Sequence, residues 1–323
     1  MSELRDIQAV INKELRDFEN LTNQSLKEEK YLLKDIIDYG FSIGGKRIRP
    51  TLMFLIANIF GSPTPATYRS AVILELIHTA SLTHDDVLDE SDMRRGRKTI
   101  NKCWDNNTAI LFGDYLYGKC LQLIKTSEDF NLLPIYAKVA IALPKGELLQ
   151  QSVSQYGIYS EEDYFEIIYN KTASLLEASC EAGAMTCNAV SDYALAKEIG
   201  RNLGIAYQIK DDILDFSINK DVGKPIGNDI MEKKITLPMI YFLKSLQEDR
   251  RNEVLAFIKA DNKEENQIKS LINTLLEGDF IKQAEEQVAF YSNKAKQIIS
   301  SLPQNAYSKA LSDFADYFIG RQQ

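Results

Sequence analysis

Two long apolar stretches end in the same pattern of aspartates, HTASLTHDDVLDESDMRRG (78–96) and GIAYQIKDDILDF (204–216). Apolar residues recur at steps of three and four before each group, which predicts helices rather than strands. Residues four apart share one face of a helix, so Asp85 and Asp89 project together, and so do Asp211 and Asp215. The sequence therefore predicts two apolar helices, each with a group of carboxylates at its C-terminal end.

The same periodicity continues outward from these two stretches along almost the whole chain. We expect helices at about 3–20, 26–39, from Arg49-Pro50 onward, at 67–90, 107–126, 131–155, 161–188 and 192–217, and from about 236 to the C-terminus. Several of these are apolar on more than one face, which predicts that they lie centrally. No strand-turn-strand alternation stands out. We therefore expect an all-α fold of roughly ten or more helices in a single domain spanning 1–323.

The composition excludes several classes of protein. Of the 323 residues, 45% are hydrophobic and 26% charged, which are ordinary globular values. The net charge of −8 argues against a nucleic-acid partner. The 4 cysteines form no CxxC pair and there are only 2 histidines, so a zinc site of the usual spacing is excluded. With a polar N-terminus and no uncharged apolar run of about 20 residues, we expect a cytoplasmic protein without a membrane segment.

The two aspartate groups predict a metal site. Crowded carboxylates repel one another, and at a helix C-terminus they also oppose the helix dipole. A hard divalent ion such as Mg²⁺ removes this conflict, and Mg²⁺ prefers one or two carboxylates completed by waters and substrate phosphates. One such triplet is a weak signal, but two in the same helical context predict a paired site, and the EF-hand pattern of a calcium-binding protein is absent. The candidate metal ligands are Asp85, Asp86, Asp89, Asp211, Asp212 and Asp215.

Basic residues accompany both triplets. They are Arg94 and Arg95 after the first, Lys224, Lys233 and Lys234 after the second, and Lys46, Arg47 and Arg49 in the upstream stretch GGKRIRP (44–50). This stretch is either a solvated basic loop or a phosphate-binding loop, and it lacks the P-loop pattern. Together these features suit two polyphosphate substrates, one held through Mg²⁺ and one held directly by lysine and arginine. They favour ionisation of an allylic diphosphate followed by carbon–carbon bond formation.

The ordered blocks of the chain resemble the trans-isoprenyl diphosphate synthases, or polyprenyl synthetases, of the long-chain type. The blocks are GGKRIRP, HTASLTHDDVLDESDMRRG, GELLQQ (146–151), KTASLLEA (171–178), YQIKDDILDF and GKPIGNDIMEKKITLP (223–238). The resemblance implies an isoprenoid synthase fold, a helical barrel around a deep central cavity. It also implies a homodimer, three Mg²⁺ per active site, and condensation of isopentenyl diphosphate with an allylic diphosphate, followed by proton elimination. A terpene cyclase would typically lack the second triplet and GGKRIRP, and a silent partner subunit would usually lose aspartates.

The resemblance also implies roles for individual residues. Asp85, Asp89 and Asp211 would be the most direct metal ligands. The allylic diphosphate would be bound by Arg94, Lys171, Gln208, Lys224 and Lys234, and Lys171, Thr172 and Gln208 would act in catalysis, the last two by stabilising the carbocation. Isopentenyl diphosphate would be bound by Lys46, Arg49, His78 and Arg95, although His78 alone also reads as a packed histidine. Where the family usually has Glu-Gly-Lys, this chain has Glu232-Lys233-Lys234, so Lys233 competes with Lys234 for the binding role.

The residues before the first triplet are expected to set product length. A helix rises about 5.4 Å per turn, close to one isoprene unit, so the residues upstream of Asp85 act as a ruler. One turn back lie the small residues Ala80 and Ser81, with Ile77 further down. Short-chain members of the family carry aromatic residues there, or an insertion in the triplet, and this chain has neither. We therefore expect the tunnel to stay open past this level and the product to be long, about six to ten isoprene units and near octaprenyl. A short-chain farnesyl or geranylgeranyl diphosphate synthase is the alternative, in which the small residues only permit close packing.

Overall fold

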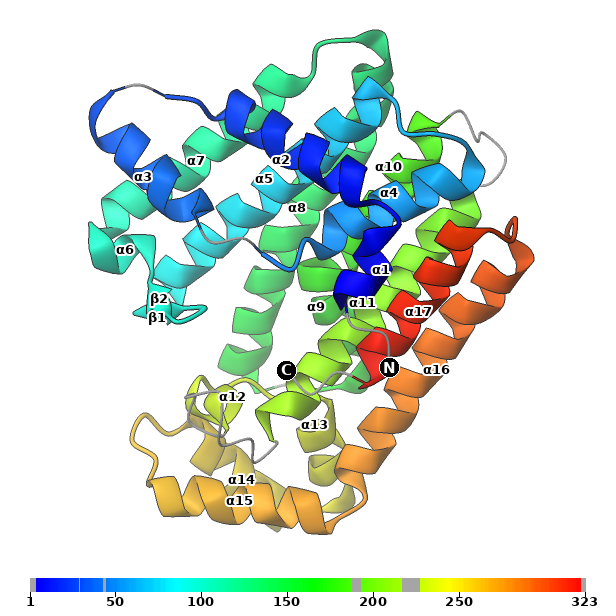
Figure 1. Cartoon of the computed structure of the whole chain (residues 1–323). Coiled ribbons are helices and arrows are strands. Elements are labelled where there is room, and N and C mark those ends of the chain that lie inside the picture. Colours follow the sequence, from blue (N-terminus) through cyan, green and yellow to red (C-terminus); the bar gives the residue numbers. More distant parts are fainter. Residues whose placement is uncertain are drawn as a thin grey trace.

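The computed structural model describes residues 4–28, 30–42, 45–157, 159–187, 193–216 and 227–320. These residues are almost entirely helical, and the expected all-α class is confirmed (Figure 1). The elements are α1 (Leu4–Ala9), α2 (Asn12–Ser25), α3 (Tyr31–Phe41), α4 (Ile48–Phe60), α5 (Pro65–Leu88), β1 (Met93–Arg94), β2 (Arg97–Lys98), α6 (Ile100–Cys103), α7 (Asn106–Leu123), α8 (Ser127–Tyr156), α9 (Glu161–Ile168), the π-helical segment η1 (Tyr169–Ala173), α10 (Ser174–Thr186), α11 (Tyr193–Asp215), α12 (Asn228–Met231), α13 (Leu237–Ser245), α14 (Glu248–Lys259), α15 (Glu265–Glu277), α16 (Phe280–Ser301) and α17 (Ala306–Gly320).

The helices α4, α5, α10 and α11 form the centre of the molecule. Of these, α10 and α11 come from the stretches that were expected to lie centrally. Nearly every residue of α4 and α10 is buried, and α5 is buried along most of its length. Two glycines let α11 pack tightly. A Cβ on Gly200 would lie 2.5 Å from the Leu176 carbonyl oxygen, and one on Gly204 would lie 2.5 Å from the Ala173 Cα. The helix that carries the second triplet is therefore fixed against η1 and α10.

The peripheral helices extend this core at one end. α16 and α17 lie against α11, while α12 to α15 gather at the lower end of the view in Figure 1. In the part of the chain that is described, no helix combines the length and apolar character needed to cross a membrane.

The sequence-based boundaries were wrong at two places. The helix expected at 3–20 is broken between α1 and α2, where Ile11 leaves helical geometry with φ −124° and ψ 23°. The helix expected at 161–188 is interrupted by η1. Such wide turns are often found at functional sites. A break of one turn does not disturb the apolar periodicity, so the pattern could not reveal either feature.

A short β-hairpin directly after α5 was also missed. β1 and β2 pair antiparallel, with Arg94 opposite Arg97, and the turn residues Arg95 and Gly96 have φ of 50° and 75°. Two central residues with positive φ are typical of the tight two-residue hairpin turn. Strands of two residues are too short to produce a visible alternation. The hairpin holds Arg94 and Arg95 beside the end of α5.

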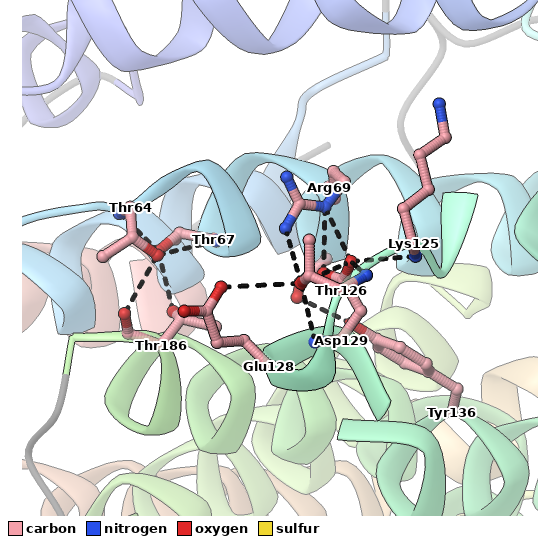
Figure 2. Close-up of polar contacts among 10 residues, drawn as sticks. Thr64, Thr67, Arg69, Lys125, Thr126, Glu128, Asp129, Tyr136 and Thr186 are labelled. Atoms are coloured by element: carbon pink, nitrogen blue, oxygen red, sulfur yellow. Dashed lines mark hydrogen bonds and ion pairs between the residues drawn. The ribbon is translucent and has the colours of Figure 1, made fainter. Parts of the chain in front are cut away.

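The N-terminal ends of α5 and α8 are joined by a polar network, shown in Figure 2. The fully buried Asp129 accepts hydrogen bonds from Arg69 Nε at 2.9 Å and from the backbone N–H of Thr126 at 2.9 Å. Nearby, the hydroxyl groups of Ser70 and Tyr136 are 2.7 Å apart. These contacts fix the start of α8 against α5, at the end opposite to the first triplet.

Candidate active site

The first triplet lies at the C-terminal end of α5, with Asp89 as its C-cap residue. Asp86 is buried and accepts a hydrogen bond from Arg94 Nε at 2.8 Å. Burial raises the pKa of Asp85 to about 6; the carboxylates of Glu147 and Asp89 also raise it, while Lys171 and Arg94 lower it. Asp85 therefore lies among carboxylates in a partly dry position, where a cation would relieve the repulsion.

The second triplet lies at the C-terminal end of α11. Asp212 is buried, and its Oδ2 accepts a hydrogen bond from the Tyr164 hydroxyl at 2.6 Å while its Oδ1 accepts one from Gln208 Nε2 at 2.8 Å. Burial raises the pKa of Asp212 to about 7. Asp211 is exposed, and Asp215 Oδ2 accepts the backbone N–H of Asp229 at 3.0 Å.

Lysine side chains connect the surroundings of the two triplets. Lys234 Nζ lies 3.8 Å from Asp89 Oδ2 of the first triplet and 2.5 Å from Glu232 Oε2. Burial raises the pKa of Asp229 well above its usual value; Asp212 and Asp215 raise it further, and Lys234 opposes the shift. Lys234 therefore lies near Asp89 of the first triplet and also near Asp229, whose carboxyl group is close to the second triplet. The two groups of aspartates, more than a hundred residues apart in sequence, face a common region.

A cavity of about 160 Å³ lies in this region. Among its lining residues are four that the sequence predicted for the site, Lys171, Gln208, Asp212 and Lys234, together with the competing Lys233. Lys171 Nζ contacts Glu147 Oε2 at 2.5 Å and Gln150 Oε1 at 3.1 Å, and Thr172 Oγ1 donates to Gln208 Oε1 at 2.6 Å. Lys171 and Thr172 belong to η1. The glycine at position 146 of α8 lets η1 pack closely against α8, because a Cβ on Gly146 would lie 2.7 Å from Lys171 Cγ.

A second cavity of about 110 Å³ lies on the other side of the end of α5. His78, Arg94 and Arg95 line it. Burial lowers the pKa of His78 well below its usual value, and the charges of Arg49, Arg95 and Arg94 lower it further. Among the described residues, the buried Nε of Arg49 has no hydrogen-bond partner. This is a basic, partly dry pocket suited to an anion.

Three predicted residues, Lys46, Arg49 and Arg94, do not line the cavity that would hold the substrate assigned to them. Arg94, assigned to the allylic diphosphate, lines the second cavity rather than the first. Lys46 is exposed and does not line either of these cavities, although the adjacent Gly45 approaches Arg95 so closely that a Cβ would lie 3.0 Å from its Nη1. Lys224 lies outside the described residues.

Arg47 of the same basic stretch is part of the scaffold. Its Nε lies 2.6 Å from Glu19 Oε1 and its Nη1 lies 3.2 Å from Glu75 Oε1. These two ion pairs occupy its guanidinium group. Arg47 nevertheless lines the second cavity, as its partner Glu75 does.

The donor set fits a hard divalent cation. The groups that converge are carboxylates, and those of Glu147 and Asp89 add to the effect of burial in raising the pKa of Asp85. Within the described residues, no three acidic, histidine or cysteine side chains are already gathered closely enough to enclose an ion. Mg²⁺ does not require such a cage, because it keeps several waters and takes the remaining ligands from substrate phosphates.

The residues expected to set product length lie on α5 before the triplet. Ala80 is fully buried and Ile77 is 2% exposed, whereas Ser81 is partly exposed. Ser81 Oγ donates to the His78 carbonyl oxygen at 3.0 Å. Of the two small residues, Ser81 is therefore the one with space beside it.

The sequence analysis missed several polar residues of the site. Tyr164, Asp229 and Thr236 line the first cavity, and Glu147 and Gln150 hold Lys171. Glu147 and Gln150 belong to GELLQQ and Asp229 to GKPIGND, so the blocks were visible but their roles were not. Tyr164 lies in an ordinary amphipathic helix and gave no signal.

Comparison with known proteins decides the family. The polyprenyl synthetase family model matches residues 30–275. The chain belongs to the polyprenyl synthetase family. This member is 35% identical to the octaprenyl diphosphate synthase of Haemophilus influenzae over 86% of the chain and 85% of that protein.

Solved structures agree with this assignment. A decaprenyl diphosphate synthase from Rhodobacter capsulatus matches 99% of this polyprenyl synthetase and 100% of its own chain, with a TM-score of 0.93 and 28% identity. A geranylgeranyl pyrophosphate synthase from Bacteroides thetaiotaomicron matches 98% of each chain, with a TM-score of 0.84 and 33% identity. The expected resemblance is therefore confirmed.

Proposed function

We propose that this polyprenyl synthetase is a prenyltransferase that condenses isopentenyl diphosphate with an allylic diphosphate to make a long-chain all-trans polyprenyl diphosphate. The observation that carries the proposal is that Lys234 lies 3.8 Å from Asp89 of the first triplet and lines the first cavity together with Asp212 of the second. Crowded carboxylates beside buried lysines suit a diphosphate held with metal ions. The octaprenyl and decaprenyl synthases among its relatives support the long-chain class.

The two cavities suit the two substrates. In the first, Lys171 and Lys234 would bind the allylic diphosphate, and Gln208 and Thr172 lie close to where its first carbon would be. In the second, His78 and Arg95, with Arg49, would bind isopentenyl diphosphate. The C–O bond of the allylic substrate breaks with its electron pair going to diphosphate. Its first carbon then bonds to the double bond of isopentenyl diphosphate, and a proton is lost, for which the departing diphosphate is the proposed base.

The aspartates Asp85, Asp89 and Asp211 would hold Mg²⁺, for which we propose three ions per site. Mg²⁺ supplies positive charge that stabilises the leaving diphosphate. The protein's own contribution is to keep the carboxylates partly dry and to place Lys171 and Lys234 beside them.

The test mixes the protein with labelled isopentenyl diphosphate, geranylgeranyl diphosphate and Mg²⁺, and identifies the extracted products by chromatography. We expect elongated all-trans products that are lost when a chelator removes the metal. Cyclised hydrocarbons would favour a terpene cyclase, and no incorporation of isopentenyl diphosphate would refute the proposal.

The long-chain product is tested at Ser81. The similarity to a geranylgeranyl pyrophosphate synthase makes a short-chain product the second candidate. We expect Ser81→Phe to shorten the product by several isoprene units, because an aromatic ring there would block growth one turn before Asp85. Ser81→Ala is the control and should leave the length unchanged. If Ser81→Phe made a product of unchanged length, the residues before Asp85 would not set product length.

We also propose a homodimer. α7 and α8 expose apolar side chains, which are Ile110, Leu111, Leu121, Phe130, Ile141 and Leu148, with exposures of 42% to 68%. Apolar surface of this kind marks interaction sites, and a second copy of the chain would cover it. Sedimentation should show a dimer that Ile141→Lys converts to a monomer. A wild-type monomer would contradict the proposal.

A cytoplasmic location is proposed on the cysteines. No disulfide joins the 4 cysteines, all of which lie in the described part of the chain, and Cys103 is exposed, as suits a reducing compartment. The single domain over 1–323 stays a prediction.

A further inference from the structure

A chain of hydrogen bonds connects three elements at the first cavity. The Tyr164 hydroxyl of α9 donates to Asp212 Oδ2 at 2.6 Å. Gln208 Nε2 of α11 donates to Asp212 Oδ1 at 2.8 Å, and Thr172 Oγ1 of η1 donates to Gln208 Oε1 at 2.6 Å. Tyr164 and Asp212 are 5% and 7% exposed, so water does not readily replace these bonds. Each oxygen of the Asp212 carboxylate therefore has a donor from the protein itself.

The direction of these bonds follows from the chemistry of the groups. The amide of Gln208 turns its NH₂ group toward Asp212, where Nε2 donates to the oxygen that Tyr164 leaves open. Its carbonyl oxygen then faces Thr172. The hydroxyl group of Thr172 has one proton, and that proton is given to Gln208. Toward any other group, the oxygen of Thr172 can present only lone pairs.

We propose that Tyr164 and Asp212 are positioning residues, which act through Gln208 to keep the lone pairs of Thr172 available to the reacting carbon. This inference rests on the proposed function, in which positive charge develops on the allylic substrate near Thr172. An oxygen fixed as an acceptor stabilises that charge without reorganising during the reaction, whereas a proton pointing at it would oppose it. Asp212 then serves the chain of hydrogen bonds and is not a direct Mg²⁺ ligand, unlike Asp211.

The first experiment measures binding without catalysis. Calorimetry with Mg²⁺ and inorganic pyrophosphate compares the wild type with Asp212→Asn and Asp211→Asn. We expect Asp212→Asn to keep the affinity within about twofold and Asp211→Asn to weaken it about tenfold or more, as loss of one charge-assisted contact would. An equal loss in both variants would make Asp212 a ligand and overturn the proposal.

The second experiment is a double-mutant cycle on catalysis. Tyr164→Phe removes only the hydroxyl group, and we expect kcat to fall about tenfold with both KM values unchanged, the effect of one lost hydrogen bond on the transition state. Because Tyr164 acts through Thr172, the same substitution should have no further effect in a Thr172→Val background. Thr172→Ser should retain most of the activity and the sensitivity to Tyr164→Phe.

The control is Tyr241→Phe, since the Tyr241 hydroxyl donates to Glu161 at 3.3 Å and not to the triplet. It should leave kcat unchanged. If Tyr164→Phe lowers kcat by the same factor in both backgrounds, or raises KM instead, the positioning role is refuted. Gln208→Leu is a second variant for the same cycle if Tyr164→Phe does not fold. A wild-type protein that binds pyrophosphate but condenses nothing would refute the proposed function, and with it this inference, while leaving the binding result as a separate finding.

Discussion

The two aspartate triplets have the same spacing but different surroundings. In the first, the middle carboxylate of Asp86 is paired with the charged guanidinium of Arg94. In the second, the middle carboxylate of Asp212 is held by the neutral donors Tyr164 and Gln208. The comparison teaches that identical motifs divide their work. In each, the middle carboxylate is buried and held by side chains of the protein. We propose Asp85, Asp89 and Asp211, among the outer ones, as the metal ligands.

The largest expected effect comes from an outer aspartate of the first triplet. We expect Asp85→Asn to lower kcat by about a thousandfold, because it removes a ligand of the charge that stabilises the leaving group. Steady-state kinetics at saturating Mg²⁺ measures this. Asp92→Asn is the matched control, since Asp92 is in the same stretch but pairs with Lys102 at 3.0 Å, and its kcat should stay within twofold. Equal effects at both positions would mean that the triplet has no special role.

Much of this comparison could be predicted from the sequence, and part of it could not. Helical periodicity and the spacing of the aspartates are local properties, so the two helices and their terminal carboxylates were predicted correctly. The partners of Asp86 and Asp212 are set by other elements. Arg94 reaches Asp86 from the strand β1, and Tyr164 on α9, 48 residues before Asp212, reaches that residue from another helix. Contacts of this kind depend on tertiary packing, which periodicity does not encode.

The basic residues show the same limit. GGKRIRP was correctly identified as a cation-rich stretch, but its sequence does not show that Arg47 is bound to Glu19 and Glu75 while Arg49 is left beside His78. The π-helical segment that carries Lys171 could not be predicted from the sequence pattern either, because it inserts a single wide turn between two regular helices. Which cation faces the site is decided by the rotation of each helix.

A second prediction concerns the charges behind the second triplet. Glu177 on α10 is 1% exposed, and Arg201 Nε of α11 and Lys138 Nζ lie 2.7 Å and 2.6 Å from its carboxylate. Asp212 of the second triplet is held by neutral donors, but α11, the helix that carries this triplet, is attached to α10 by the ion pair between Arg201 and Glu177. We expect Glu177→Gln to lower the free energy of unfolding by about 2 kcal/mol, since it removes the charge of a buried carboxylate that two half-exposed cations share. Urea denaturation measures this.

The contribution of Glu177 to the free energy of unfolding should depend on pH in a defined direction. Burial alone would raise the pKa of Glu177, but the hydrogen bonds and charges of Arg201 and Lys138 outweigh it and lower the pKa below its ordinary 4.5. The ionised group therefore stabilises the fold above pH 4.5, and this stabilisation is lost as the pH falls through the folded-state pKa. The difference in the free energy of unfolding between the wild type and Glu177→Gln should therefore become smaller as the pH falls. A difference that widens there would contradict the ion-pair account.

The smallest expected effect separates the two neighbouring lysines that the sequence left in competition. Lys234 Nζ lies near Asp89, whereas Lys233 has φ 60° and its Nζ contacts Asp261 at 2.5 Å. The Asp261 side chain is 89% exposed, so this second pair contributes little. We expect Lys234→Met to raise KM for the allylic diphosphate about tenfold, and Lys233→Met to change it less than twofold. Because both variants remove one positive charge and keep a chain of similar length, a general loss of charge would affect them equally. Equal effects would show that the proximity of Lys234 to the first triplet does not decide substrate binding.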